Sequence, residues 1–261
     1  MDKKEKHLRN FNWLRYLNYS LLPMSILVFW YVVTKTGEVP TVLLPTIGSV
    51  IESFGDQIRS GRLIQDISIS LMRILKGYSL AALIGVTLGV AMGMNEKINR
   101  FFIFTFTSIR QIPMLAWIPL LVMWFGIGEE SKVAVIFLAS YFPIMINTVS
   151  GIKRTDPKLI EVGKMYGLNY WELFTKIYLP SALPSIFVGL KLGLGISWMA
   201  VVGAEMIAAN SGIGFRINDA RSLMQSSVVF SGIISIAIAG VIMDWILTWI
   251  AKASTPWEVS D

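Results

Sequence analysis

The chain alternates between long apolar stretches and short polar connections. The apolar stretches cover residues 19–34, 75–94, 101–125, 133–149, 186–209 and 228–251. A helix rises about 1.5 Å per residue, so roughly 20 apolar residues cross the hydrocarbon layer of a bilayer. The pattern therefore predicts an all-α integral membrane bundle of about six transmembrane helices.

The third stretch, 101–125, is the least regular, because Arg110, Gln111 and Pro113 interrupt it. Proline removes a helical hydrogen bond and disfavours helix at the residue before it. We expect either one span here, or an interfacial helix followed by a crossing that starts at about Ile112.

The composition agrees with a lipid environment. The chain has 261 residues, of which 54% are hydrophobic and only 15% are charged, whereas soluble domains carry about 25% charged residues. Residues 1–261 are therefore expected to form a single membrane domain without a soluble module. The absence of cysteine excludes disulfides, thiolate metal sites and a cysteine nucleophile.

The net charge of +6 would suggest a nucleic-acid partner in a soluble protein, but here the basic residues gather in particular connections. The N-terminal arm over 1–18 and the connection over 151–184 are both rich in them, and Lys and Arg are preferentially kept on the cytoplasmic side. We therefore expect a multi-pass membrane protein, surrounded by lipid, with both termini in the cytoplasm and no nucleic-acid partner. No small-residue cleavage pattern follows Val33, so the first apolar stretch is expected to be retained.

Two connections are predicted to have structure of their own. The first follows Pro45, where apolar residues recur at helical spacing and predict an amphipathic helix on the outer side; these residues are Ile47, Val50, Ile51, Phe54 and Ile58. The second is the connection over 151–184, which is too rich in charged residues to be a span.

A short helix is predicted to begin this second connection. Asp156 and Pro157 form a typical N-cap and first-position pair, and Gly167 stands where a helix end often needs a left-handed backbone. One face of the helix then carries Leu159, Val162, Gly163 and Tyr166.

A second short helix is expected directly afterwards. Asn169 and Glu172 have capping-box spacing, and Leu168 with Leu173 fits the hydrophobic staple around it. We expect this helix to end at Leu179 and Pro180.

No catalytic constellation accompanies these elements. Gly163-Lys164 is followed by Met165 and lacks the upstream glycine of a phosphate-binding loop. The single histidine, His7, lies in the basic arm and is expected to be solvated. We therefore expect a chain that is not an enzyme and that needs no cofactor and no metal.

In this inner connection the chain resembles the permease subunits of bacterial binding-protein-dependent importers of the ATP-binding cassette superfamily. Their signature is Glu-Ala-Ala, three residues, Gly, nine residues, Ile, one residue and Leu-Pro. Both spacings are matched here by Glu161-Val162-Gly163, Gly167, Ile177 and Leu179-Pro180. Val and Gly replace the two alanines.

The resemblance covers most of the chain, with a core over about 71–251. It is closest to the nitrate, sulfonate and taurine permeases. The motifs that carry this subgroup are Ile112-Pro113, Ala116-Trp117-Ile118-Pro119-Leu120, Trp124-Phe125-Gly126-Ile127-Gly128, Phe142-Pro143-Ile144, Asn147-Thr148 and Ala204-Glu205-Met206-Ile207.

The resemblance implies a coupling role for the inner connection, whose first helix docks in a cleft of the ATPase subunit in that family. The residues expected to couple to the ATPase are Leu159, Glu161, Val162, Gly163, Tyr166, Gly167, Ile177, Leu179 and Pro180. The alternative is an ordinary connector between spans. The implied partners are two separate ATPase subunits, a second permease copy and an extracytoplasmic solute-binding protein.

Ionisable residues within spans are costly unless paired or wetted, so each is a functional candidate. Lys191 and Asp244 have matched depths and are candidates for an ion pair, the alternative being that Lys191 reaches the surface alone. Glu205 either lines the path or makes a structural hydrogen bond. Arg110 attracts either an anionic solute or a phospholipid headgroup.

The candidates for the translocation path are Arg110, Gln111, Trp198 and Glu205. Elsewhere in the spans, Gly85, Gly89 and Gly93 recur every four residues and predict a close helix approach.

The substrate expected from the resemblance is a small anion such as an aliphatic sulfonate, taurine or nitrate. A pyrimidine-type vitamin precursor or another small organic solute is the alternative. A self-sufficient secondary transporter or channel is a competing class, but the sequence shows neither the internal repeats nor the carboxylate relays that such folds usually carry.

Overall fold

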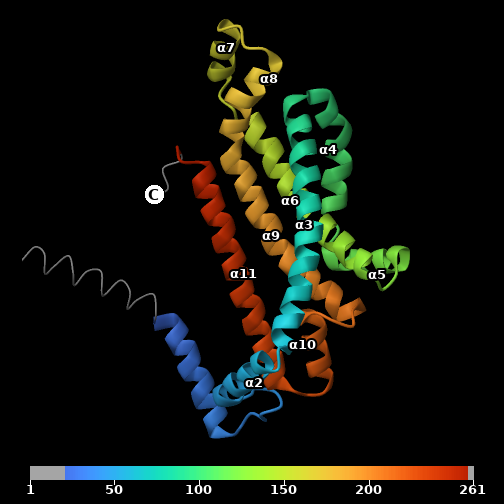
Figure 1. Cartoon of the computed structure of the whole chain (residues 1–261), viewed down its shortest axis with the longest axis vertical. Coiled ribbons are helices and arrows are strands. Elements are labelled where there is room, and N and C mark those ends of the chain that lie inside the picture. The colour runs from blue at the N-terminus through green and yellow to red at the C-terminus, as the bar shows by residue number, and fades with distance from the viewer. Residues whose placement is uncertain (1–20, 258–261) are drawn as a thin grey trace, which may run out of the picture.

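The computed structural model describes residues 21–257, and every regular element in that range is helical (Figure 1). The basic arm predicted over 1–18 lies outside the described residues. An apolar helix over Leu21–Thr36 comes first. The following elements are α2 (Ile47–Arg59), α3 (Arg62–Met94), α4 (Glu96–Arg110), α5 (Met114–Phe125), α6 (Glu129–Lys153), α7 (Pro157–Met165), α8 (Tyr170–Leu173), the π-helical turn η1 (Phe174–Tyr178), α9 (Leu179–Ala208), α10 (Ile213–Ser222) and α11 (Ser226–Ser254).

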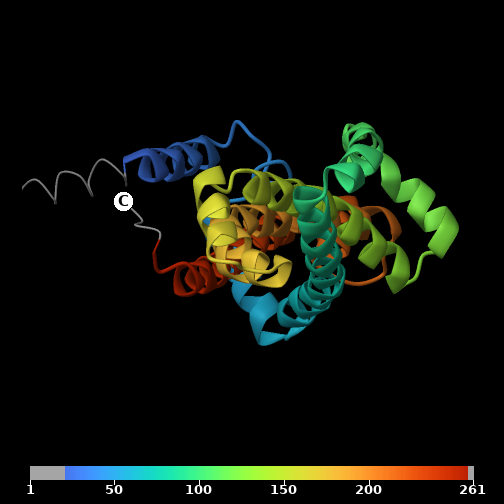
Figure 2. The same ribbon diagram turned by 90° about the horizontal axis from the view of Figure 1, so that it is seen from above.

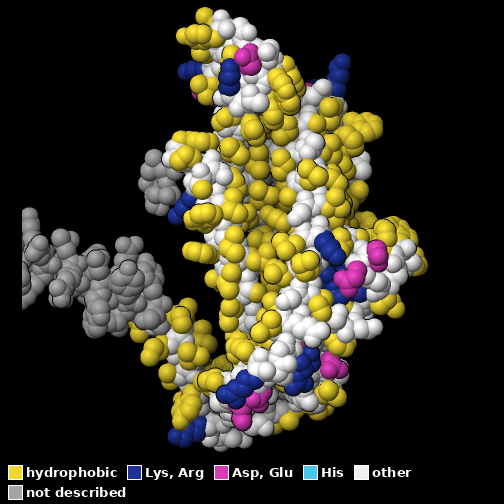
Figure 3. All heavy atoms as spheres, viewed as in Figure 1, with side chains coloured by type: hydrophobic (Ala, Val, Ile, Leu, Met, Phe, Trp, Pro, Cys, Tyr) yellow, Lys and Arg dark blue, Asp and Glu magenta, His cyan; other side chains and the backbone are white. Residues whose placement is uncertain are grey.

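Four long helical units in the described range are apolar enough to cross a membrane. They are α3, α6, the unit over Tyr170–Ala208 and α11, and the bent pair α4 and α5 is a candidate for a fifth. Apolar side chains cover the middle of the molecule, whereas many charged side chains lie toward its two ends (Figure 3). The prediction of an all-α membrane bundle is confirmed, and the described part of the first apolar helix covers Leu21–Thr36.

Small residues bring α3 and α6 into close contact. A Cβ on Gly89 would lie 2.6 Å from Thr148 Cβ, and one on Gly93 would lie 2.6 Å from Ile152 Cβ. These distances are shorter than van der Waals contact, so only glycine permits this separation of the two helices. The close approach predicted from the glycine spacing is confirmed.

The third apolar stretch is divided between two helices. Residues Glu96–Arg110 run as α4 beside α3 and α6, and α5 turns aside at an angle of 99° (Figure 1). The stretch therefore does not form one straight span, and it breaks at the residues that interrupt it in the sequence. The apolar face of α4, which includes Phe102 and Phe106, packs on α3 and α6, and Pro113 prevents the helix from continuing straight.

The two ends of the bundle carry different elements (Figure 1). At one end are α7 and α8, and at the opposite end are α2 and α10. The predicted amphipathic helix is present as α2, which Thr46 caps by accepting a hydrogen bond from the N–H of Ser49. Val50 is buried and Phe54 packs on the core formed by α3 and α10. Viewed from above, α7 and α8 overlie the bundle, with α5 on one flank and the helix over Leu21–Thr36 on the other (Figure 2).

Candidate functional site

The element formed by α7, α8 and η1 begins with the predicted N-cap. The side chain of Asp156 accepts a hydrogen bond of 2.9 Å from the N–H of Lys158, and Pro157 occupies the first turn of α7. Proline has no N–H to leave unpaired at this position. The start of the helix is therefore fixed by its own sequence.

The end of α7 is equally well defined. Gly167 has φ +72°, in the left-handed region that was predicted for it. Its N–H donates to the carbonyl of Lys164 at 3.0 Å, and the N–H of Leu168 donates to the carbonyl of Gly163 at 3.1 Å. These two bonds form a Schellman motif, which ends a helix sharply and satisfies its last carbonyls.

The second short helix, α8, has the predicted capping box. Asn169 Oδ1 accepts from the N–H of Glu172 at 2.9 Å, and Glu172 Oε2 accepts from the N–H of Asn169 at 3.0 Å. Lys176 Nζ lies 3.1 Å from Glu172 Oε1. Both ends of the α7–α8 turn are therefore held by hydrogen bonds within the element.

Gly163 explains how α7 packs on α8 and η1. A Cβ at this position would lie 2.5 Å from Ile177 Cδ1 and 2.8 Å from Leu173 Cδ2. A side chain here would displace the ends of the Ile177 and Leu173 side chains, so the glycine that replaces an alanine of the family signature permits a tighter contact. The α7–α8–η1 element is thus packed as one unit and not held by its caps alone.

Most of the other predicted coupling residues lie on the outer surface of this unit, whereas Leu179 packs on the core with Ile152 and Ala182. Leu159 and Val162 are 50% and 49% exposed, and Tyr166 is 83% exposed. Together with Ile177 and Pro180 they border a hollow of about 380 Å³. Glu161 is also exposed. The surface is apolar with a charged border, which is the composition expected of a protein contact.

Leu179 and Pro180 do not end the second helix, contrary to the prediction. The chain passes through η1 directly into α9, and the N–H of Leu179 donates to the carbonyl of Phe174. Pro180 then lies in the first turn of α9. The π-helical turn accommodates the proline, so α8 and α9 form one bent but continuous helical unit.

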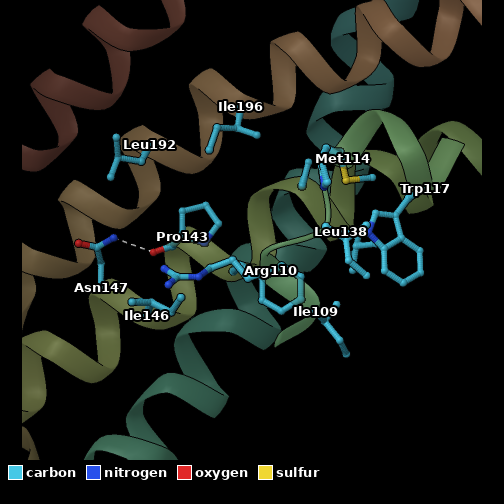
Figure 4. Close-up of a pocket in the computed structure, with 14 residues that line it drawn as sticks. Ile109, Arg110, Met114, Trp117, Leu138, Pro143, Ile146, Asn147, Leu192 and Ile196 are labelled. Carbon is cyan, nitrogen blue, oxygen red and sulfur yellow. Dashed lines mark hydrogen bonds between the residues drawn. The ribbon is translucent and has the colours of Figure 1, made fainter. Parts of the chain in front are cut away.

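A second candidate site is a pocket between α4, α5, α6 and α9 (Figure 4). Its volume is about 410 Å³. Arg110 is the only one of the four predicted path residues that lines it, and Figure 4 shows its side chain extending toward Pro143 and Asn147. Gln111 is exposed but does not line the pocket.

The structure places Trp198 and Glu205 in the protein interior. Trp198 packs with Ile74 and Val201 in an apolar cluster. Glu205 has no exposed surface, and it accepts hydrogen bonds from Ser70 Oγ at 2.8 Å and from the N–H of Gly214 at 2.9 Å. Of the two interpretations of Glu205, the geometry matches the structural hydrogen bond.

Glu205 belongs to a buried charge network that the sequence analysis did not predict. Arg73 Nη1 lies 2.8 Å from Glu205 Oε1, and Arg73 Nε donates to Glu129 Oε2 at 2.7 Å. Asp66 accepts from Arg216 Nε at 2.7 Å. The network therefore ties α3 to α6, α9 and α10.

The spacing of three polar residues in the sequence could have indicated this network. Asp66, Ser70 and Arg73 stand at helical spacing and share one face of α3. They precede the apolar stretch over 75–94, so a search for apolar residues alone does not include them in the membrane helix. The helix in fact begins at Arg62.

The ion pair predicted between Lys191 and Asp244 is absent from the salt bridges of residues 21–257. The contact between α9 and α11 is instead apolar, with Met243 packed near Trp198. Asp244 is the next residue after Met243 and is therefore rotated about 100° around α11. Its side chain is exposed.

Comparison with known proteins agrees with these features. Residues 81–255 match the family described as binding-protein-dependent transport system inner membrane component. A putative aliphatic sulfonates transport permease protein of Bacillus subtilis (strain 168) is 34% identical over 258 residues, covering 99% of this chain and 92% of that protein. A taurine transport system permease protein of Escherichia coli (strain K12) is 32% identical, covering 97% and 95%.

The fold has also been seen in solved structures. An inward-facing methionine ABC transporter superposes with a TM-score of 0.66 at 16% identity, covering 76% of this chain and 99% of that chain. At this identity the likeness shows the fold alone. From the matched family model and the two relatives, the chain belongs to the inner membrane components of binding-protein-dependent transport systems.

Proposed function

We propose that this chain is the membrane-spanning subunit through which an importer moves a small anion into the cell. Two separate ATPase subunits supply the energy, an extracytoplasmic binding protein delivers the solute, and a second copy of the chain completes the pathway. An aliphatic sulfonate, taurine or nitrate is the proposed cargo. The names of the sulfonate and taurine relatives support this choice of substrate class.

The observation that carries the proposal is the α7–α8–η1 element. It is capped at each helix start, ended by a Schellman turn at Gly167, and packed closely at Gly163 against Ile177 and Leu173. A unit held in this way moves as a rigid body. Because η1 continues directly into α9, a displacement of α7 is passed to a long membrane helix.

The outer surface of α7 supports docking of the ATPase at this position. Leu159 and Val162 are half exposed at one extremity of the molecule (Figure 1). An apolar surface on a charged element is costly to leave in water and favourable to bury in a partner. The proposed orientation therefore places α7 in the cytoplasm, and α2 and α10 on the outer side.

The test is assembly of the complex. Leu159→Glu puts a charge into the proposed contact, and Leu223→Glu is the matched control, because Leu223 is 59% exposed at the opposite end of the bundle. The amount of ATPase that co-purifies with the chain should fall for Leu159→Glu and stay at the wild-type level for Leu223→Glu. ATP-driven uptake of labelled taurine into vesicles should fall in parallel. Normal assembly and uptake with Leu159→Glu would refute the coupling role.

A further inference from the structure

The connection between α4 and α5 interrupts a pair of helices that together are apolar enough to be one span. The 15 residues of α4 extend over about 22 Å, which is less than the roughly 30 Å of hydrocarbon. The chain then bends by 99° across Gln111, Ile112 and Pro113. Non-helical backbone at membrane depth is tolerated only where protein buries it or where it lines a wet cavity.

Arg110 is the last residue of α4 and stands directly at this break. A guanidinium is always charged and costly to place in hydrocarbon. Yet among residues 21–257 no carboxylate forms a salt bridge with it. This contrasts with Arg73, which has two carboxylate partners. Arg110 therefore carries an uncompensated positive charge at the wall of the pocket.

Further polar groups lie on the same pocket wall. Asn147 Nδ2 donates to the carbonyl of Pro143 at 2.8 Å, which fixes the amide at the pocket surface (Figure 4). Pro143 itself lies within α6 and has no N–H, so the carbonyl of Ala139, one turn earlier, lacks its helical donor. Ala139 also lines the pocket.

The rest of the lining is apolar. Trp117, Leu138 and Ile196 face the same space as Arg110 (Figure 4). The pocket thus combines one unpaired cation with an aliphatic and aromatic wall. Its volume of about 410 Å³ falls within the range of small-molecule sites.

We propose that this pocket is a binding site within the membrane for the transported solute, with Arg110 holding its oxyanion head and the apolar wall holding its short organic tail. The guanidinium matches a sulfonate or carboxylate because its N–H groups can donate in parallel to two oxygens. The proposal deepens the proposed function and rests on it, because it names the residue that selects an anion.

The headgroup of an anionic phospholipid offers the same oxyanion chemistry. The mixed lining favours a small solute, because Arg110 and Asn147 line a pocket whose remaining walls are apolar side chains of α4, α5, α6 and α9. The experiment must nevertheless separate the two sources.

The test measures binding by fluorine NMR, which suits weak ligands. The full chain is placed in nanodiscs of zwitterionic phosphatidylcholine and titrated with trifluoroethanesulfonate, with the neutral trifluoroethyl methyl sulfone as the matched probe. The wild type should broaden the sulfonate signal saturably and the sulfone signal far less. Arg110→Gln should weaken sulfonate binding by about tenfold or more, Arg110→Lys should lose less, and Arg100→Gln should bind as the wild type. Arg100 is the control because it pairs with Glu96 and does not line the pocket.

Three results would overturn the proposal. The first is equal sulfonate binding by the wild type and by both Arg110 variants, and the second is equal binding of the neutral sulfone. The third is loss of sulfonate binding when phosphatidylglycerol is added to the nanodiscs, since this would assign the site to lipid. The measurement needs neither ATP nor ATPase, so failure of the coupling role and failure of this site are observed separately.

Discussion

Arg73 Nη1 lies 2.8 Å from Glu205 Oε1, although the two residues are 132 positions apart in the chain. Their side chains are 3% and 0% exposed. The same guanidinium also donates to Glu129 and to the carbonyl of Ser211. The guanidinium of Arg73 therefore links α3 to α6, to α9 and to the connection before α10.

Removing one partner of this pair is expected to destabilise the chain strongly. Glu205→Leu leaves Arg73 with only the partly exposed Glu129 as a carboxylate partner, and it also removes the acceptor of Ser70. Removing one partner of a buried ion pair costs about 3–5 kcal/mol when the other charge is left unpaired, and the loss here should lie toward the lower end of that range because Glu129 still pairs with Arg73. The thermal unfolding midpoint in detergent should fall, whereas Glu52→Leu, at an exposed position on α2, should change it little.

The same pair makes a coupling experiment possible. Replacing both residues, as Arg73→Leu with Glu205→Leu, removes the charge that each single variant leaves behind. The double variant should therefore lose less stability than the two single losses added together. Simple additivity would show that the two side chains do not stabilise each other.

Replacing a glycine by alanine should lower stability in the close contact between α3 and α6, and raise it at an open position on α9. Gly89→Ala places a Cβ 2.6 Å from Thr148 Cβ and 2.9 Å from the carbonyl oxygen of Met145, and such overpacking costs about 1–3 kcal/mol. Gly195→Ala meets no atom within 4 Å and should gain up to about 1 kcal/mol of helix propensity. Unfolding midpoints of the two variants should therefore move in opposite directions, and a shared direction would contradict the packing.

Local sequence patterns predict the α7–α8 turn almost completely. Asp156 and Pro157, Gly167, and the Asn169 and Glu172 pair each act within a few residues of their own position. Caps of this kind depend on backbone geometry that neighbours in sequence determine. Distant parts of the chain are therefore not needed to predict them.

Contacts between distant helices are less accessible to sequence reasoning. Lys191 and Asp244 have similar depths, but depth does not fix how each helix is rotated, and Asp244 is exposed rather than paired with Lys191. Arg73 precedes an apolar stretch and finds its partners on α6 and α9. Hydropathy predicts neither result, because pairing depends on the packed arrangement of several helices.

Orientation across the membrane gives a further prediction. The excess of Lys and Arg in the arm over 1–18 and the connection over 151–184 predicts that both lie in the cytoplasm. Reporter fusions after Asp261 and in the turn at Ser60 should therefore report opposite sides, since α2 lies at the end of the bundle opposite to α7 (Figure 1). Fusions that report the same side would contradict the proposed topology.

The final prediction concerns the turn at Gly167, where backbone strain is separable from packing. A valine at φ +72° costs at least about 1–2 kcal/mol, yet a Cβ there meets no atom within 4 Å. Gly167→Val should therefore leave the membrane helices folded while displacing α7 from its position on Ile177. Gly37→Val is the matched control, because Gly37 has φ +73° with equally open surroundings but lies far from α7.

Glu161→Lys, which reverses an exposed charge at the proposed contact, should give the same loss without backbone strain. We expect Gly167→Val and Glu161→Lys to reduce co-purification of the ATPase and solute-stimulated ATP hydrolysis, while Gly37→Val retains both. If all three variants assemble and transport equally, the α7–α8 element is only a connector between spans.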